Sequence, residues 1–298
     1  MCVRRLTLYG LELPVIEGPV NLAEMIVRAA KASGLELEDG DVVVVTSKVL
    51  LKSKGLLVDL RNIKPGVRAR LLHRLTGKDP VEAELVLRSS DKVYAVVPTS
   101  FLEEHLSEIS RDVEAGRRAL EKVKALLIVR MKNGIIASDA GVDYSNLPPG
   151  YAITSNHDFD ALAKELRDEL RKACGRDVAV VVADTEVFLS NGKVGSIDVA
   201  VGSSGIDPLA REFGERDLYG RPKFGGLDII VDELCAAAAL LMKQSREGIP
   251  VVVVKGFKYR RSERGVKDVL VTRRRRRLIG VIVKVLILNV FLKALRII

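Results

Sequence analysis

The 298-residue chain has only three cysteines and three histidines, and it has no tryptophan. Cys2, Cys174 and Cys235 are an odd number without the spacing of metal ligands, which argues against a disulfide scaffold and a zinc ribbon. The Walker-type pattern GxxxxGK is absent. The first residues lack the apolar run of a signal peptide. We therefore expect a cytoplasmic protein in a reducing compartment.

An imbalance of charge is confined to the end of the chain. Eight of the 48 basic side chains lie in residues 273–298, which contain no acidic side chain. The other 40 basic and 39 acidic side chains nearly cancel, which argues against nucleic acid as a partner of the body. Five arginines precede the mostly apolar residues 278–298. This tail predicts membrane contact, as a tail anchor or an interfacial helix, or alternatively a hydrophobic element that packs on a partner.

Apolar runs alternate with segments of helical spacing along most of the chain. Continuous apolar runs predict buried strands, at residues 41–46, 125–131, 177–183 and 249–255. Capping residues and spacing predict helices, at residues 21–32, from Pro80 onward, 158–173 and 231–242. The alternation predicts an α/β fold of the mixed α+β kind, with mixed sheets and flanking helices. We expect one domain over 1–260, with a sub-boundary near 147–150, and a C-terminal extension over 261–298.

Polar residues follow several of the predicted strands. Thr46-Ser47-Lys48, with Lys52 downstream, offers hydroxyl and ammonium groups that suit a phosphate, although a solvated strand end is the alternative. Residues 139–146 hold two carboxylates, a hydroxyl and an amide that could bind a hard cation or simply form a turn. Asp184-Thr185 could ligate Mg²⁺ or Mn²⁺, or could belong to a helix cap or a turn.

A fourth polar segment is rich in glycine and proline. Residues 202–222 are predicted to form a loop whose backbone amides could approach an anion, with Arg221 to neutralise it. The alternative is an ordered surface loop that glycine and proline stiffen. Because ligands of α/β proteins gather at strand ends, the four segments carry most weight as one set.

The order and spacing of these segments resemble the coenzyme F-420 γ-glutamyl ligase family over residues 10–260. The segments that resemble family patterns are LPxI at 13–16, TSKxxSKxxG at 46–55, AGxDxSN at 140–146, the Asp-Thr of SDT at 184–185, DxYGR at 217–221, the alanine-rich DEL helix from 231 and GIP at 248–250. The AGxDxSN segment and the alanine-rich helix are the more specific of these. The resemblance implies a mixed α/β fold peculiar to this family.

The resemblance also implies an intertwined homodimer that uses GTP and two divalent cations, Mg²⁺ or Mn²⁺. In the implied reaction the terminal carboxylate of a deazaflavin phosphodiester is phosphorylated, and the amine of L-glutamate attacks the acyl phosphate. Carried over residue by residue, Asp143 and Asp184 would ligate one metal and Thr185 would assist the other, as the catalytic residues. The implied nucleotide and cofactor contacts are Leu13, Pro14, Val15, Ile16, Ser47, Lys48, Lys52, Asn146 and Arg221.

The sequence departs from the family pattern at two places. The family continues its SDT into Phe-Gly-Arg-Pro-Trp-Arg, whereas Asp184-Thr185 runs into Glu186 and on to Lys193 without those arginines. Asp139 stands where the family usually has asparagine, which adds negative charge beside the predicted metal site. The altered loop after Thr185 leaves an alternative function open, in which a diverged relative binds a nucleotide or another phosphorylated ligand without ligating glutamate. In this alternative the tail would tether the protein to a membrane.

Overall fold

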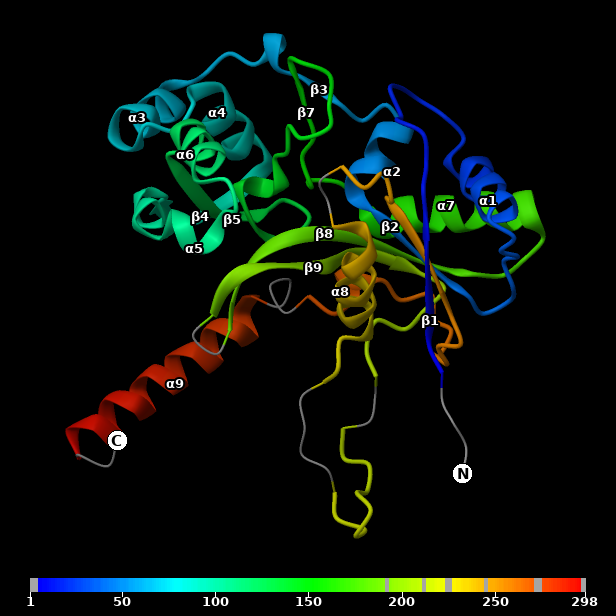
Figure 1. Ribbon diagram of the computed structural model, residues 1–298. Coiled ribbons are helices and arrows are strands. Elements are labelled where there is room, and N and C mark those ends of the chain that lie inside the picture. The colour runs from blue at the N-terminus through cyan, green and yellow to red at the C-terminus, as the bar shows by residue number, and fades with distance from the viewer. Residues whose placement is uncertain are drawn as a thin grey trace.

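A five-stranded mixed sheet forms the centre of the computed structural model, which describes residues 5–190, 193–210, 213–222, 227–243, 246–270 and 275–295. Its strands lie in the order β1 (Thr7–Leu11), β10 (Val251–Lys255), β2 (Val42–Thr46), β8 (Ala179–Ser190) and β9 (Lys193–Ser204). β2 and β8 are parallel, and the other neighbours are antiparallel. Figure 1 shows the β8–β9 pair extending beyond the rest of the sheet as a curved ribbon.

Helices cover both faces of this sheet, which explains why its central strands are continuous valine runs. On one face, Val43 and Val45 pack in a core with α1 (Leu22–Ala32) and α7 (Phe159–Cys174). On the other face, Val42 and Val44 pack with α8 (Ile230–Met242). All four valines are fully buried. Figure 1 shows α8 on the side of the sheet opposite α7, which confirms the predicted mixed fold with flanking helices.

The helix boundaries follow the capping residues in the sequence. The Asn21 side chain accepts a hydrogen bond from the Glu24 N–H at the start of α1. Asp79 caps α4 (Pro80–Ser89), whose first residue is proline. α7 begins after Asp158, which caps the Ala161 N–H, and ends at Gly175 in the left-handed conformation. The predicted helices are therefore confirmed to within a residue or two.

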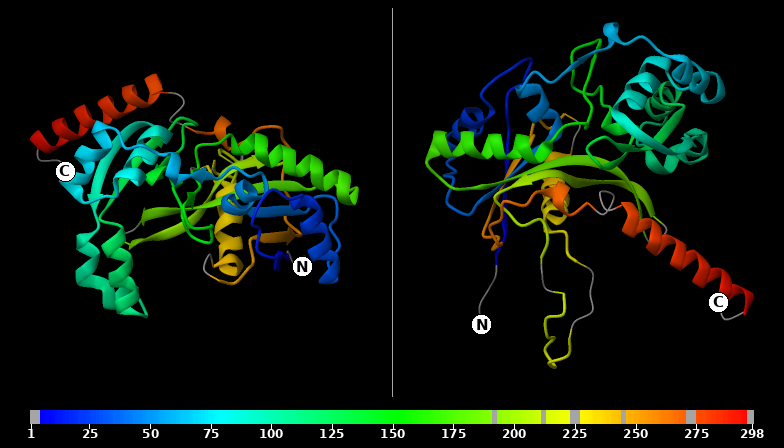
Figure 2. Two further views of the ribbon diagram at one scale, coloured as in Figure 1. Left: turned by 90° about the horizontal axis from the view of Figure 1, so that it is seen from above. Right: turned by 180° about the vertical axis from the view of Figure 1, so that it is seen from behind.

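A second, smaller sheet has its own hydrophobic core. Its antiparallel strands are β4 (Ser90–Pro98), β5 (Ala125–Met131) and β6 (Ile136–Ser138). Met131 of β5 packs with Val86 of α4 in this core. The helices of this part are α3 (Val67–Thr76), α4, α5 (Leu106–Ile109) and α6 (Val113–Lys122). Figure 2 shows this part beside the main sheet, and the boundaries expected near 147–150 and at 260 stay predictions.

Short elements connect the two sheets. α2 (Ser47–Ser53) starts directly after β2, and β3 (Val58–Asp59) pairs with β7 (Tyr151–Ala152). Beyond β7, Ile153 pairs with Asp143 through two backbone hydrogen bonds. The segment that contains Asp143 is therefore tied to the chain that leads into α7.

The predicted end of the third strand at residue 183 is wrong, because β8 continues to Ser190. Its pairing with β2 does end there, with Thr46 opposite Ala183, and the later residues pair only with β9. The predicted loop at 202–222 is also wrong at its start, because β9 extends to Ser204. The apolar run therefore corresponds to the part of β8 that lies between β2 and β9. The polar residues that follow lie in a two-stranded ribbon of β8 and β9.

The C-terminal extension forms α9 (Arg275–Ala294), which points away from the main sheet in Figure 1. Among the residues that the structure describes, no helix has both the length and the apolar composition needed to cross a membrane. Residues 273, 274 and 296–298 of the predicted tail segment lie outside the described residues.

Asp160, near the start of α7, joins three parts of the chain. Its buried carboxylate accepts hydrogen bonds from the backbone N–H groups of Ser203 (2.9 Å), Val266 (2.9 Å) and Lys267 (3.0 Å). One side chain therefore satisfies donors from the end of β9 and from the segment after β10. Without it, these N–H groups would be buried with no other acceptor in place.

We expect Asp160→Ala to lower the free energy of unfolding by about 3 kcal/mol, because it leaves several backbone donors unsatisfied. The measurement is chemical denaturation followed by circular dichroism. Asp168→Ala on the same helix is the matched control. The Asp168 side chain is 54% exposed, and its ion pair with Lys164 is long, at 3.6 Å. Equal stability of the two variants would contradict the role assigned to Asp160.

Candidate functional site

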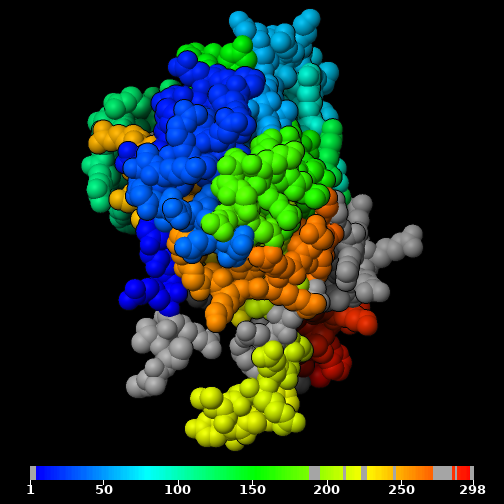
Figure 3. Space-filling view, turned by 90° about the vertical axis from the view of Figure 1, so that its right-hand side faces the viewer, coloured from blue at the N-terminus to red at the C-terminus, as the bar shows by residue number. Residues whose placement is uncertain are grey.

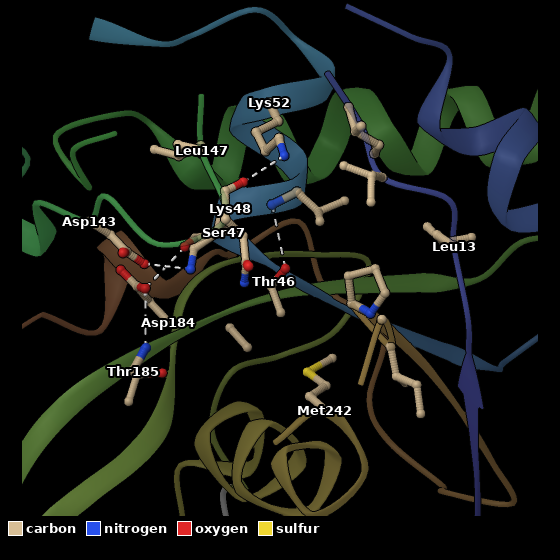
Figure 4. Close-up of a pocket in the computed structure, with 18 of the residues that line it drawn as sticks. Leu13, Thr46, Ser47, Lys48, Lys52, Asp143, Leu147, Asp184, Thr185 and Met242 are labelled. Carbon is tan, nitrogen blue, oxygen red and sulfur yellow. Dashed lines mark hydrogen bonds and ion pairs between the residues drawn. The ribbon is translucent and has the colours of Figure 1, made fainter. Parts of the chain in front are cut away.

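A cavity of about 1070 Å³ opens where β2 and the buried part of β8 end. Because these strands are parallel, their ends bring Ser47 and Asp184 to the same edge of the sheet. Figure 4 shows the side chains that line this cavity, which include most of the predicted site residues. Those predicted residues are Leu13, Pro14, Val15, Ile16, Ser47, Lys48, Lys52, Asp143, Asn146, Asp184 and Thr185.

Asp184 is held in the cavity wall by three hydrogen bonds. Its Oδ1 accepts hydrogen bonds from Ser47 Oγ (3.0 Å) and the Thr185 N–H (3.1 Å), and its Oδ2 accepts one from Ser155 Oγ (2.5 Å). Burial raises the pKa of Asp184, and the negative charge of Asp143 nearby adds to this, although the hydrogen bonds act in the opposite direction. The three donors are neutral, so they do not cancel the charge that the carboxylate carries when it is ionised.

Asp143 lies beside Asp184, and Figure 4 shows the two carboxylates close together. Lys48 Nζ is 2.6 Å from Asp143 Oδ2, and Asp143 Oδ1 accepts a hydrogen bond from the Ser145 N–H. Although burial alone would raise it, the pKa of Asp143 is held below its usual range by Lys48. Lys48 therefore occupies a position where a cation is attracted by both carboxylates.

Thr185 lines the cavity, but its hydroxyl turns toward β9. Thr185 Oγ1 donates a hydrogen bond of 2.9 Å to Asp198 Oδ1. Asp198 is 3% exposed, and sequence reasoning did not single it out. The predicted contact of Thr185 with a metal therefore stays a prediction, with its oxygen lone pairs as the available ligand atoms.

Glu186 adds a third acidic side chain next to Asp184. Its carboxylate accepts hydrogen bonds from the Ser138 N–H (3.1 Å) and Ser138 Oγ (3.2 Å). Burial raises the pKa of Glu186 to about 7, and Asp184 contributes to the same shift. The residue that departs from the family pattern is therefore tied to the second sheet through Ser138, which lines the cavity.

Lys52 brings a second ammonium group into the cavity. The Lys52 side chain is mostly buried and donates a hydrogen bond of 2.9 Å to the Asn146 carbonyl oxygen. Burial and the neighbouring Lys48 lower the pKa of Lys52. Arg246, after α8, also lines the cavity. The cationic groups of the cavity therefore come from Lys48, Lys52 and Arg246. Together with Asp143 and Asp184 they suit phosphate groups that carry a divalent cation.

Much of the cavity wall is apolar. Leu13 is fixed there because its N–H donates a hydrogen bond to the Gly248 carbonyl oxygen. The remaining wall combines residues far apart in the sequence, namely Leu147, Pro148, Pro149, Met242, Ile249 and Pro250. An apolar wall beside a charged end suits a planar ring that is joined to phosphates.

Asp139 is paired inside the fold and is not among the residues that line the cavity. Its Oδ2 accepts a hydrogen bond of 2.9 Å from the buried Lys78 Nζ, and its Oδ1 accepts one of 2.8 Å from the Leu127 N–H. Asp139 therefore shares the Lys78 ammonium group with Glu82 beside the second sheet.

Arg221 does not lie with the other predicted site residues. It belongs to an exposed turn in which the Arg221 N–H donates to Asp217 Oδ1 and the Asp217 N–H donates to the Arg221 carbonyl oxygen. Figure 3 shows the yellow segment that contains this turn standing away from the body of the chain. Arg221 is not among the residues that line the cavity. The Lys193 side chain lies outside the described residues.

Sequence reasoning missed Ser155, which is buried and bonded to Asp184. It also missed Ser138 and Arg246 as cavity residues. Ser155 and Ser138 stand in no recognisable motif, and only folding brings them to Asp184 and Glu186. Residues 248–250 also line the cavity, and the family resemblance had already identified this segment.

The donor set can be tested against a divalent cation. Asp143 and Asp184 offer carboxylate oxygens, which Mg²⁺ and Mn²⁺ prefer, and Mg²⁺ is commonly held by one or two carboxylates together with substrate phosphates. Within the described ranges, no three His, Cys, Asp or Glu side chains are grouped as a metal site made of protein alone would require. The residues therefore fit a cation that arrives with phosphate oxygens.

Comparisons with known proteins agree with the resemblance. The profile of the family described as F420-0:Gamma-glutamyl ligase matches residues 10–256. A coenzyme F420:L-glutamate ligase of Methanopyrus kandleri is 36% identical over 238 residues, which are 80% of this chain and 81% of the relative. Proteins of the same name match from Methanothermobacter thermautotrophicus (32% identity, 89% of this chain, 95% of the relative) and Methanocaldococcus jannaschii (31%, 85% and 88%). The chain therefore belongs to the F420-0:gamma-glutamyl ligase family of amide-forming ligases.

Proposed function

We propose that this ligase joins L-glutamate to a coenzyme F420-type precursor, a deazaflavin phosphodiester, with GTP and Mg²⁺ or Mn²⁺. The observation that carries the proposal is the meeting of Asp143 and Asp184 with Lys48 and Lys52 in one cavity. The relatives that share most of the chain are named for coenzyme F420 and L-glutamate. The retained carboxylates and lysines favour this function over a binding protein without turnover.

The proposed reaction has two steps that balance without an oxidant or reductant. An oxygen of the precursor carboxylate attacks the γ-phosphorus of GTP, and GDP leaves with the bond electrons. The glutamate amine then attacks the acyl carbon, phosphate leaves, and the amine loses a proton. In this proposal Lys52 and Arg246 balance phosphate charge, and the apolar wall near Leu13 and Ile249 holds a ring of a substrate.

Asp143 and Asp184 would hold a divalent cation against the phosphates, with Thr185 beside them. Such a cation, when bound, neutralises charge on the transferring phosphoryl group. Lys48 must then exchange its contact with Asp143 for one with a phosphate oxygen. Ser47 and Ser155 keep the Asp184 oxygens oriented while this exchange takes place.

We also propose that two copies of the chain form a homodimer. The exposed turn at 213–222 supports this, because Phe213, Leu218 and Tyr219 expose apolar surface on it. Light scattering after size exclusion should give twice the mass of one chain. A monomer at micromolar concentration would contradict the proposed dimer without bearing on the reaction.

Incubation with GTP, Mn²⁺, L-glutamate and the deazaflavin precursor should give a glutamylated product and GDP. Asp143→Asn and Asp184→Asn should each lower kcat/KM by about 100-fold, which is about 3 kcal/mol of transition-state stabilisation. Mass spectrometry of the product is the measurement, and Asp168→Asn on the surface of α7 is the matched control. Thermal stabilisation by GTP without product would favour the binding protein instead.

Lys52→Met should raise the KM for GTP by about tenfold, since a charge-assisted hydrogen bond to a phosphate is worth about 1.5–3 kcal/mol. Lys54→Met is the matched control from the same segment, because Lys54 faces α7 and pairs with Glu165 and Glu169. Initial rates at varied GTP give both constants. A KM for GTP that changes equally in the two variants would argue against a phosphate contact of Lys52.

A further inference from the structure

A strained turn lies between the second sheet and the site. Asp139, Ala140 and Gly141 have φ angles of 48°, 55° and 61°, which place three successive residues in the left-handed region. For residues other than glycine this conformation costs about 1–2 kcal/mol each. Because Asp139 and Ala140 carry side chains, contacts around this 139–141 turn must hold it in place.

The 139–141 turn fixes the surroundings of both acidic residues of the site. The Ala140 carbonyl oxygen accepts a hydrogen bond of 3.1 Å from the Ser155 N–H. Gly141 lies so close to Ser155 that a Cβ at this position would come within 2.2 Å of Ser155 Oγ. Ser155 Oγ in turn donates to Asp184 Oδ2. Two residues after the turn, Asp143 pairs with Ile153 through backbone hydrogen bonds.

Asp139 anchors the turn through both carboxylate oxygens. One accepts a hydrogen bond from the Leu127 N–H on β5, and the other accepts one from Lys78 Nζ. Lys78 is 1% exposed, so this ion pair is shielded from solvent. Lys78 Nζ also contacts Glu82 Oε1 at 2.5 Å and donates to the Ala125 carbonyl oxygen at 3.0 Å.

These bonds use the three donors of the Lys78 ammonium group and tie α4, β5 and the turn to one point. Lys78 is not among the residues that line the cavity. It touches the turn and no candidate substrate position. Of the three groups that Lys78 contacts, Asp139 is the one that belongs to the turn, so it provides the direct path from Lys78 to the site.

We infer that Lys78 is a positioning residue for the site, because it holds Asp139 and so fixes the left-handed turn that orients Asp143 and seats Ser155 on Asp184. The effect on ligand binding rests on the proposed function, whereas the effect on the turn does not. Without Lys78, the Asp139 carboxylate would be buried without its counter-ion, and the turn would relax from its strained conformation.

The first experiment compares Lys78→Met with Lys54→Met, which also removes a lysine that pairs with two carboxylates but lies away from the turn. Amide hydrogen exchange of peptides that cover 139–145 should become at least about tenfold faster in Lys78→Met and stay unchanged in Lys54→Met. Calorimetry with Mn²⁺ and GTP, without the other substrates, should show about tenfold weaker binding in Lys78→Met alone. Circular dichroism below the unfolding transition checks that both variants are folded.

A double-mutant cycle tests the path through Asp139. Asp139→Asn leaves the bonds of Lys78 to Glu82 and Ala125 in place, so it serves if Lys78→Met does not fold. We expect Asp139→Asn to weaken Mn²⁺–GTP binding about threefold, and Lys78→Met to add less than about threefold in that background. If the double variant is more stable than Lys78→Met but binds Mn²⁺–GTP no more tightly, Lys78 positions the site. A purely structural role would restore stability and binding together.

The outcomes distinguish this inference from the proposed function. Wild-type protein that does not bind Mn²⁺–GTP would contradict the proposed function, and the exchange rates at 139–145 would still decide whether Lys78 fixes the turn. Unchanged amide exchange at 139–145 in folded Lys78→Met would overturn the inference. If the wild type binds Mn²⁺–GTP, independent effects of the two substitutions on this binding would also overturn it.

Discussion

The parallel pairing of β2 with β8 is the constraint on which the site depends. Thr46 lies opposite Ala183, so the residues that follow each of them meet at one edge of the sheet. Ser47 can therefore donate to Asp184 although 137 positions separate them in the chain. The valines of β2 are buried on both faces, so this parallel pair lies in the core of the sheet.

The site balances opposite charges in a partly buried volume. Asp143 and Asp184 share the cavity with Lys48, Lys52 and Arg246, Glu186 lies beside Asp184, and burial shifts the pKa values of several of these groups. Partly buried carboxylates without cations are costly, so the Lys48–Asp143 pair stabilises the arrangement before any ligand arrives. The same lysines are then available for phosphate groups. Charge balance within the fold and affinity for a charged ligand therefore have the same origin.

The second sheet contributes to the site from a distance. Its strand β5 and helix α4 hold Asp139 through Leu127 and Lys78, and Asp139 begins the left-handed turn that leads to Asp143. Ser138 at the end of β6 meets Glu186 from the ribbon of the main sheet. The two sheets therefore meet at the acidic end of the cavity, and their relative placement sets its geometry.

The sequence alone was enough to identify the local elements and the family. Valine runs, caps such as Asn21 and Asp79, and the ordered motifs around Asp143 and Asp184 depend only on neighbours in the chain or on spacing, so they can be read directly. It did not show that β8 continues past Ala183, because a two-stranded ribbon needs no apolar run.

The tertiary structure decided which polar residues meet. Ser155 reaches Asp184, Lys48 pairs with Asp143, Lys78 pairs with Asp139, and Arg221 lies on an exposed turn outside the cavity. Each of these outcomes joins or separates residues that lie far apart in the sequence. The physical reason is that a hydrogen bond or an ion pair depends on distance in space, which strand register and the strained turn fix only after the chain has folded.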